Sequence, residues 1–384
     1  MEKFFAPCPR GLEKLLAQEL QALGAAAAQA TAGGAAFSGE FALAYKVNLH
    51  SRLASRVLWQ IAKQSYRSEQ DIYQIAYALP WASWFDSALT IRVNVSAIRC
   101  PLTSLDFVTL KIKDAVCDRL REESGKRPSV DTQQPDIRIH AFLDAQEATL
   151  YLDTSGEALF KRGWRKMAGA APLRENLAAG ILLLSGWAPG IPLLDPMCGS
   201  GTFLLEAALM ALDIAPGMGR QFAFEKLGNF DTRRWQALRR AAEQRKKNKT
   251  ALPIHGSDLY GEALKLARAN LAAAGLEDAV MLKQANMLEI SAPEKSGILI
   301  TNPPYGKRVG ETEELEKFYP LLGDMFKKKF SGWNCYIFSA DMRLPKLIRL
   351  TASKRTPLYN GALECRLFEY KMVTGSMRRE KRER

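Results

Sequence analysis

The sequence predicts an α/β protein in which an α+β region precedes a mostly parallel, Rossmann-like, doubly wound sheet. The first observation is an alternation of short apolar runs with amphipathic stretches from residue 191 to residue 339, which is typical of βα units. The second is a mixture of helix and strand patterns, without that alternation, in the first 155 residues. A last pair of strand patterns around Asn360 and Gly361 is expected to add an antiparallel edge hairpin.

The first 155 residues predict two small α+β units with no obvious catalytic cluster, so binding and positioning are their expected roles. The first unit should hold a strand at 3–7, a helix at 12–23 closed by Gly24, an edge strand with a turn at 25–36, and a helix at 42–62. In that last helix, Leu49, Leu53, Val57 and Ile61 recur at helical spacing. The second unit should hold helices at 71–79 and 105–120, the latter capped by Ser104 or Asp106, and strands at 89–97, 136–144 and 148–153.

The chain after residue 173 predicts the doubly wound sheet. Its expected strands lie at 191–195, 253–258, 280–286, 297–301 and 334–339, with two more inside 356–373. Its expected helices lie at 174–184, 202–212, 261–274 and 315–330. The order of these elements, with a helix between successive strands, predicts parallel pairing and a crevice at the carboxyl ends of the strands.

Residues 213–250 are longer than a normal connection and predict an inserted helix capped by Asp231. Trp235, Leu238 and Ala242 share one face of this helix. The stretch is the most basic in the chain, and its cations are Arg233, Arg234, Arg239, Arg240, Arg245, Lys246, Lys247 and Lys249. Two interpretations are open, a solvated charged helix and a surface that contacts phosphates; so many like charges with few acids favour the second.

The overall charge points to a polyanionic partner. Among 384 residues, 54 are basic and 41 are acidic, which gives a formal charge of +13 and a pI near 9.4. Nucleic acid is the first candidate for such a partner. The six cysteines are scattered and the three histidines lie far from them, so we expect neither a metal site nor disulfides. The start of the chain has no apolar leader and no stretch is long enough to span a membrane, which predicts a soluble cytoplasmic protein with no membrane partner.

A basic cluster containing a tryptophan follows the second unit. It comprises Lys161, Arg162, Arg165 and Lys166 around Trp164. Cations next to an aromatic ring suit contact with nucleic acid, where the ring stacks on a base. An interdomain connector whose tryptophan packs between domains explains the same residues equally well.

The first strand of the predicted sheet leads into a glycine-containing loop and a helix. The loop reads Asp195-Pro196-Met197-Cys198-Gly199-Ser200-Gly201-Thr202. Glycines let the backbone approach a ligand closely, and the absence of a third glycine and of a Gly-Lys-Ser/Thr sequence favours a ligand without a pyrophosphate. Asp258, at the end of the next strand, could bind a ribose hydroxyl pair. Asn286 with Met287, after the third strand, could bind an adenine edge.

The fourth strand runs into Asn302-Pro303-Pro304-Tyr305, followed by the cations Lys307 and Arg308. Consecutive prolines supply no amide protons and hold the backbone extended, so the carbonyls of Asn302 and Pro303 remain available as acceptors. An acceptor pair beside an aromatic ring suits the binding of a planar amine. A strand that ends in a proline turn is the structural alternative for this tetrapeptide.

These two motifs resemble those of the S-adenosylmethionine-dependent amino methyltransferases, specifically the THUMP-containing RNA guanine-N2 methyltransferases that act on bacterial 23S rRNA. The similarity extends to Lys161-Arg162-Gly163-Trp164-Arg165, to Ala171-Pro172-Leu173-Arg174-Glu175 and to the stretches 332–334 and 338–340. It implies a ferredoxin-like part at 1–65, a THUMP-like RNA-binding domain at 66–155, a basic linker at 156–170, a methyltransferase domain at 171–375 with the insertion 213–250, and a charged tail at 376–384. One methyltransferase domain implies one modification.

The resemblance also implies roles for individual residues. S-adenosylmethionine would be the cofactor, with its methionine part at Asp195, Gly199 and Gly201, its ribose at Asp258 and its adenine at Asn286. Met197, Cys198, Thr202 and Met287 would complete that site. Asn302, Pro303, Pro304 and Tyr305 would hold the target amine, and Lys161, Arg162, Trp164, Arg165, Lys307 and Arg308 would bind the RNA.

The expected function is therefore methylation of the N2 amine of a guanosine in 23S rRNA. The tetrapeptide alone does not distinguish guanine from adenine, so an adenine-N6 DNA methyltransferase is an alternative. A noncatalytic RNA-binding or ribosome assembly factor is another. A protein glutamine methyltransferase would also use this tetrapeptide, but it fits the basic charge and the N-terminal region poorly.

Overall fold

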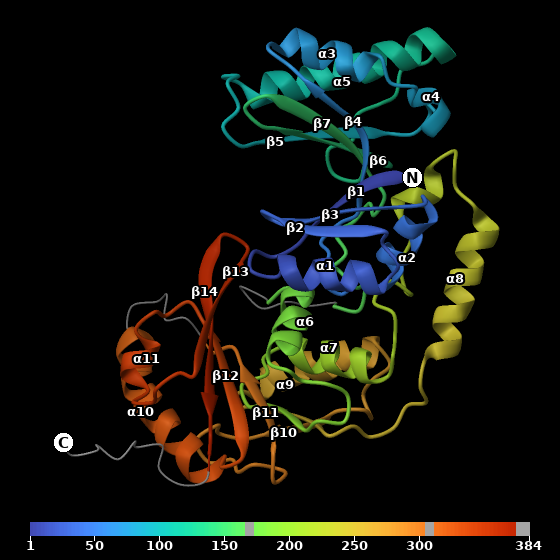
Figure 1. Cartoon of the computed structure of the whole chain (residues 1–384). Helices are drawn as coiled ribbons and strands as arrows, with labels where there is room; N and C mark the ends of the chain where they lie inside the picture. Colours follow the sequence, from blue (N-terminus) through green and yellow to red (C-terminus); the bar gives the residue numbers. More distant parts are fainter. Residues whose placement is uncertain (166–172, 304–310, 374–384) are drawn as a thin grey trace. The chain divides into compact units, whose positions relative to one another are not determined.

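The computed structural model describes residues 1–165, 173–303 and 311–373, which fold into two compact units (Figure 1). The N-terminal unit comprises Met1–Cys8, Glu13–Phe160 and Pro216–Gln244, and the C-terminal unit comprises Pro9–Leu12, Lys161–Ala215 and Arg245–Arg384. The predicted charged tail at 376–384 lies outside the described residues. None of the helices in the described ranges combines the length and apolar character that crossing a membrane requires.

The N-terminal unit is built on one continuous sheet of seven strands in the order β2-β3-β1-β4-β7-β6-β5. The strands are β1 (Glu2–Pro7), β2 (Ala27–Thr31), β3 (Gly34–Gly39), β4 (Leu58–Ser65), β5 (Ile91–Ala97), β6 (Ile137–Leu143) and β7 (Glu147–Asp153). The helices are α1 (Glu13–Ala22), α2 (Ala42–His50), α3 (Glu69–Tyr77), α4 (Trp81–Trp84) and α5 (Leu105–Ser124). Strand β4 pairs with β1 on one side and with β7 on the other, so it joins the two predicted α+β units into one sheet.

The predicted helix at 42–62 is wrong beyond His50, because residues 58–65 form the central strand β4. The half-buried carboxylate of Glu19 on α1 explains where the helix ends. It accepts hydrogen bonds from the Ser51 hydroxyl at 2.5 Å and from the Arg52 amide at 2.8 Å, which draws the chain out of the helical path. Of the apolar residues at helical spacing, Leu49 therefore lies in α2, Leu53 and Val57 lie in the loop, and Ile61 lies in β4.

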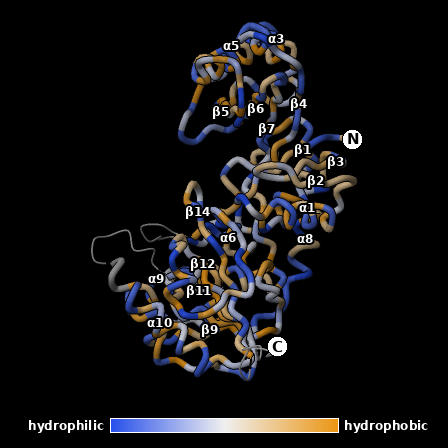
Figure 2. Tube along the Cα trace, turned by 60° about the vertical axis from the view of Figure 1, so that its left-hand side comes forward, coloured by the Kyte–Doolittle hydropathy of each residue, from blue (hydrophilic) through white to orange (hydrophobic). Residues whose placement is uncertain are grey.

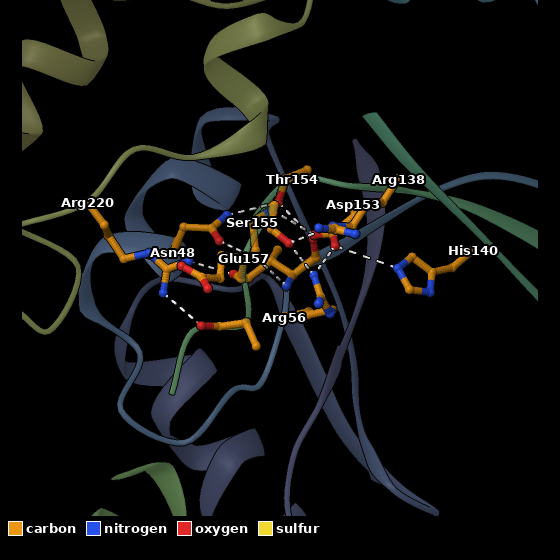
Figure 3. Close-up of polar contacts among 12 residues, drawn as sticks. Asn48, Arg56, Arg138, His140, Asp153, Thr154, Ser155, Glu157 and Arg220 are labelled. Atoms are coloured by element: carbon orange, nitrogen blue, oxygen red, sulfur yellow. Dashed lines mark hydrogen bonds and ion pairs between the residues drawn. The ribbon is translucent and has the colours of Figure 1, made fainter. Parts of the chain in front are cut away.

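Polar side chains join α2 and the segment before β4 to the end of β7 (Figure 3). The Asn48 side-chain amide donates to the Thr154 hydroxyl at 2.9 Å, and the Ser155 hydroxyl donates to the Asn48 side-chain oxygen, Oδ1, at 2.6 Å. Asp153 is buried and forms an ion pair with Arg56. Burial alone would raise the pKa of Asp153, but the neighbouring His140 and Arg56 lower it, so this carboxyl stays ionised in the interior.

The inserted helix packs in the N-terminal unit, although it interrupts the part of the chain that forms the C-terminal unit. The insertion contains η1 (Ala223–Lys226) and α8 (Thr232–Arg245), and the predicted cap is confirmed because the Asp231 carboxylate accepts from the Arg234 amide at 2.9 Å. Of the three residues predicted to share one face, Trp235 and Ala242 are buried and Leu238 is half-buried. The ring centroids of Trp235 and Phe224 lie 5.1 Å apart, and those of Phe224 and Tyr45 on α2 lie 4.5 Å apart. An aromatic cluster therefore fastens the insertion to the N-terminal unit.

The C-terminal unit contains the predicted doubly wound sheet, in the order β10-β9-β8-β11-β12-β14-β13. Its strands are β8 (Leu193–Asp195), β9 (Ile254–Asp258), β10 (Met281–Gln284), β11 (Gly297–Thr301), β12 (Trp333–Ser339), β13 (Lys354–Asn360) and β14 (Leu363–Lys371). Each neighbouring pair among β10, β9, β8, β11 and β12 is parallel. Strand β14 pairs antiparallel with both β12 and β13. The prediction of a parallel sheet with an antiparallel edge hairpin is confirmed.

Helices cover both faces of this sheet (Figure 1). They are α6 (Glu175–Leu184), α7 (Thr202–Ala211) and α9 (Gly261–Ala273) on one side, and α10 (Glu311–Lys329) and α11 (Leu344–Leu347) on the other. Tyr319, Leu322 and Phe326 of α10 are fully buried in one core with Leu299 and Ile337 of the neighbouring strands. Figure 2 shows apolar residues gathered along β9, β11 and β12, the strands between these helices.

We predict that Trp235→Ala loosens the insertion from the N-terminal unit. Removing a buried indole from an aromatic cluster typically costs about 3–5 kcal/mol. The expected result is a lower melting temperature together with faster tryptic cleavage within α8, measured by calorimetry and by limited proteolysis. Gln236→Ala, which changes an exposed neighbour on the same helix, should leave both unchanged. Cleavage at the wild-type rate would show that the cluster does not hold the insertion.

Candidate functional site

The candidate site lies where the chain order of the parallel sheet reverses. Strand β8 pairs with β9 on one side and with β11 on the other, in a register that sets Leu194 beside Leu299. Helix α7 follows β8 and helix α10 follows β11, and the two helices lie on opposite faces of the sheet. This reversal places a crevice at the carboxyl ends of the two strands. Asp195, Asp258 and Thr301 end the three strands, and Asn302 follows β11 directly. The structure thus brings together strand-end residues that the sequence predicted to share one crevice.

The loop between β8 and α7 has a left-handed backbone at both of its glycines. The φ angle is +52° at Gly199 and +81° at Gly201, and Gly201 is the residue that precedes α7. A Cβ atom placed on Gly199 would meet nothing within 4 Å, whereas one on Gly201 would lie 3.2 Å from Ala267 on α9. The backbone at Gly199 therefore faces space that a ligand could use, and Gly201 is required for close packing. A ligand that approaches this loop fits the residues present.

Backbone hydrogen bonds hold the loop against the end of β9. The Gly199 amide donates to the Asp258 carboxylate at 2.9 Å, and the Tyr260 amide donates to its other oxygen at 3.0 Å. The Cys198 amide donates to the Ser257 carbonyl at 2.9 Å. Each carboxylate oxygen of Asp258 retains a second lone pair, so the group can still accept hydrogen bonds from a ribose. Burial raises the pKa of the Cys198 thiol, which argues against a nucleophilic thiolate at this position.

Asp195 is the most perturbed acid of the crevice. Its side chain is buried at the end of β8, and desolvation raises its pKa to about 8, with a further contribution from the charge of Asp258. The Met197 amide donates to it at 3.3 Å, which only partly offsets the cost of burying the charge. A carboxyl in this state is ready to pair with a cationic group that enters the crevice.

Asn286 and Met287 follow β10, which ends two residues earlier than expected, at Gln284. The Asn286 side chain forms a turn: its oxygen accepts from the Leu288 amide at 3.1 Å and its amide donates to Glu289 at 3.2 Å. Asn286 is half-buried, so a ligand edge can still reach it. The Met287 side chain packs into the hydrophobic core with Leu299 and Phe326.

Asn302 is half-buried and Pro303 is buried, at the point where β11 ends beside β8. This position agrees with the expectation that the tetrapeptide begins at the crevice. Four predicted site residues, Pro304, Tyr305, Lys307 and Arg308, lie outside the described residues.

The basic linker departs from its predicted role at two positions. Arg162 is buried in an ion pair with Glu206 of α7, at 3.3 Å, with 2% and 0% of the two side chains exposed. Trp164 is also buried. Neither side chain is exposed for contact with RNA, whereas Lys161 is exposed. Arg165 is mostly buried and contacts Glu175 and Thr202.

Sequence reasoning missed Glu175 and Glu206, the acidic partners of the linker arginines. Glu206 is the one charged residue in the sequence Thr-Phe-Leu-Leu-Glu-Ala-Ala-Leu-Met-Ala that forms α7. A carboxylate in an otherwise apolar helix is costly to bury without a cation. The sequence of α7 alone could therefore have predicted a basic side chain beside Glu206. Within the described ranges, no group of three or more metal-binding side chains is arranged to hold a metal ion.

Comparison with known proteins adds three family matches. The model described as "RMKL-like, methyltransferase domain" matches residues 162–369, the THUMP domain model matches residues 66–153, and the RlmL ferredoxin-like domain model matches residues 3–58. The chain is 40% identical over 370 residues to slr0064 of Synechocystis sp., described as a candidate RNA methyltransferase, and 96% of each chain is covered. It is 42% identical over 379 residues to ribosomal RNA large subunit methyltransferase K/L of Syntrophotalea carbinolica, covering 96% of this chain and 53% of that protein.

The chain thus spans about half the length of the K/L relatives it matches. Among solved structures, SMU.472, described as a candidate methyltransferase and crystallised with SAH, superposes with a TM-score of 0.88 at 31% identity. The match covers 98% of this chain and 99% of that one.

We predict that Asp195→Asn stabilises the protein increasingly as the pH rises. The pKa of Asp195 is about 8 in the folded state, against about 3.9 for an unfolded aspartate, so its ionisation opposes folding progressively between these values. The difference in melting temperature between Asp195→Asn and wild type should therefore be larger at about pH 9 than at about pH 5. Gln236→Ala, an exposed change that removes no titratable group, should show no such trend. A pH-independent difference would mean that Asp195 is not a raised-pKa group.

Proposed function

This chain belongs to the RMKL-like methyltransferase family, and from that premise we propose that it methylates the exocyclic N2 amine of a guanosine in 23S rRNA. The proposal rests above all on one observation: the glycine loop after β8 and Asn302 after β11 stand at the ends of adjacent parallel strands. A methyl donor bound by the loop and an amine bound at Asn302 would then share one crevice. The names of the K/L relatives supply the rRNA substrate for this proposal.

The residues present fit S-adenosylmethionine as the donor, and the SAH complex of SMU.472 supports this assignment. When bound, the cofactor would supply a methyl group on a sulfonium, which is already a strong electrophile. Asp195 and the backbone at Gly199 and Gly201 would hold its methionine part, and Asp258 its ribose. Asn286 would lie at the adenine. Binding of the ammonium group at Asp195 would favour the ionised carboxyl and release a proton near neutral pH.

The acceptor side depends on Asn302 and Pro303. An exocyclic amine on a purine is a poor nucleophile because its lone pair is delocalised into the ring. The Asn302 side-chain oxygen and the Pro303 carbonyl would accept its two protons, which localises electron density on the nitrogen. The main contribution of the chain is then alignment of the nitrogen with the methyl group, and no strong base is required.

The target base would have to leave its stack to reach this crevice, at a cost of a few kcal/mol. Stacking on Tyr305 would return roughly 1–3 kcal/mol of that cost.

The inserted helix α8 supplies a cationic surface suited to RNA phosphates. Arg233 and Arg240 are exposed and lie on the face opposite the buried Trp235 and Ala242. Other cations of the insertion have protein partners, since Arg234 pairs with Glu40 and Arg245 pairs with Asp213. Lys161, Lys307 and Arg308 remain proposed contacts to the RNA.

The alternative of an adenine-N6 DNA methyltransferase rests on the shared tetrapeptide, and the THUMP match weighs against it. A comparison of unmethylated 23S rRNA with DNA as acceptors separates the two. The alternative of a noncatalytic assembly factor is tested by the variant Asn302→Ala.

We predict that Asn302→Ala reduces methyl transfer by about a hundredfold or more, because one of two acceptors for the target amine is removed. The readout is N2-methylguanosine in a nucleoside digest of in vitro transcribed 23S rRNA after incubation with the donor. Binding of SAH should be unchanged, since the assigned donor contacts lie on other strands. A methylated adenine in the digest, or equal activity on DNA, would contradict the proposed substrate. Undiminished cellular function of Asn302→Ala would favour the assembly factor.

We also predict that Arg233→Gln/Arg240→Gln weakens RNA binding and flattens its salt dependence. Each lost phosphate contact should reduce the slope of log K against log salt concentration by roughly 0.7–0.9. Filter binding of 23S rRNA over a series of salt concentrations measures this slope. Lys328→Gln on α10 removes an exposed charge outside the insertion and should not alter it. Wild-type slopes for the double variant would exclude α8 from the RNA-binding surface.

A further inference from the structure

Arg165 of the basic linker contacts the first residue of α7. Its guanidinium donates to the Thr202 hydroxyl oxygen at 2.6 Å and to the Leu173 carbonyl at 3.1 Å. Thr202 follows Gly201, so this contact is made at the end of the glycine loop where the helix begins. A residue expected to bind RNA is thus attached to the loop assigned to the methyl donor.

The surroundings of Arg165 fix its guanidinium in place. Its Nε atom lies 3.2 Å from the Glu175 carboxylate, and only 14% and 4% of these two side chains are exposed. Burial raises the pKa of Glu175, and the charge of Arg165 opposes that rise. Three residues earlier, Arg162 pairs with Glu206 one turn along α7. Two linker arginines therefore hold the same helix at Thr202 and Glu206.

The chemistry of this contact determines how Thr202 can act. A guanidinium has only donors, so the hydroxyl oxygen of Thr202 must be the acceptor in the hydrogen bond with Arg165. The hydroxyl proton is then left to donate to a different acceptor, and the adjacent positive charge makes it a stronger donor. The first backbone amides of a helix also favour an anion at this position. Both features suit a carboxylate.

We propose that Arg165 is a positioning residue that sets Thr202 as a hydrogen-bond donor to the α-carboxylate of the methyl donor. This inference rests on the proposed function, because the loop must bind S-adenosylmethionine or SAH for the contact to matter. It reassigns Arg165 from the RNA to the cofactor, and it assigns the carboxylate of the cofactor to the start of α7.

The test compares two ligands by isothermal titration calorimetry on the full chain: SAH, which has the carboxylate, and 5′-methylthioadenosine, which lacks the whole amino-acid part. The variants are Thr202→Val, Thr202→Ser and Arg165→Met/Glu175→Gln, in which both members of the buried ion pair are neutralised together. We expect Thr202→Val and Arg165→Met/Glu175→Gln each to weaken SAH binding by about tenfold or more, the loss typical of a hydrogen bond to a charged group. Methylthioadenosine binding should change less than about twofold, and Thr202→Ser should bind SAH like the wild type.

Combining the variants tests whether Arg165 acts through Thr202. Adding Thr202→Val to Arg165→Met/Glu175→Gln should cause little further loss, because the two changes remove the same contact. Lys346→Met, an exposed change on α11, serves as the control for SAH binding. If Arg165→Met/Glu175→Gln fails to fold, Arg165→Lys replaces it with the same expectation, since an ammonium cannot reproduce the planar guanidinium that bridges Thr202 and Glu175.

Equal losses for SAH and methylthioadenosine would overturn the inference, as would fully additive losses in the combined variant or a failure of Thr202→Ser to preserve binding. A wild-type chain that does not bind SAH would instead overturn the proposed function. The two failures are therefore distinguishable.

Discussion

The structure of the site depends on the pairing of β8 with β11. These strands are adjacent and parallel although about 100 residues of chain separate them, so their carboxyl ends meet at one edge of the sheet. Asp195 is buried at this edge, where desolvation raises its pKa to about 8. A carboxyl at that position is unfavourable when ionised alone and favourable when a cation is present. A positively charged ligand that enters the crevice would therefore stabilise the ionised form of the Asp195 carboxyl.

How much could be predicted from sequence depended on how fully an element is buried. Strand β11 was predicted at 297–301 and is found at Gly297–Thr301, because a parallel strand covered on both faces reads as an uninterrupted apolar run. Strand β4 was missed because only Leu58 and Trp59 of its eight residues are buried, which leaves no clear alternation. The bond that ends the preceding helix comes from Glu19, about 30 residues away, and no local pattern reports it.

The same distinction applies to the site. Asp195, Asp258 and Asn302 were predictable because their places at strand ends follow from local patterns. The roles of Arg162 and Arg165 were not, because their partners Glu206 and Glu175 become neighbours only after folding. A basic cluster in a sequence does not distinguish cations that face solvent from cations that neutralise buried acids.

The electrostatic argument for an RNA partner does not depend on Arg162 and Arg165. Arg162 and Arg165 each pair with one carboxylate, so the two ion pairs contribute no net charge. The formal charge of +13 is therefore carried entirely by the other residues of the chain. Exposed cations such as Arg233 and Arg240 contribute to that excess, and because they are solvated, phosphates can approach them without a large desolvation cost. In the proposed function, the buried Arg162 and Arg165 support the helix that follows the glycine loop, and exposed arginines such as Arg233 and Arg240 attract the RNA.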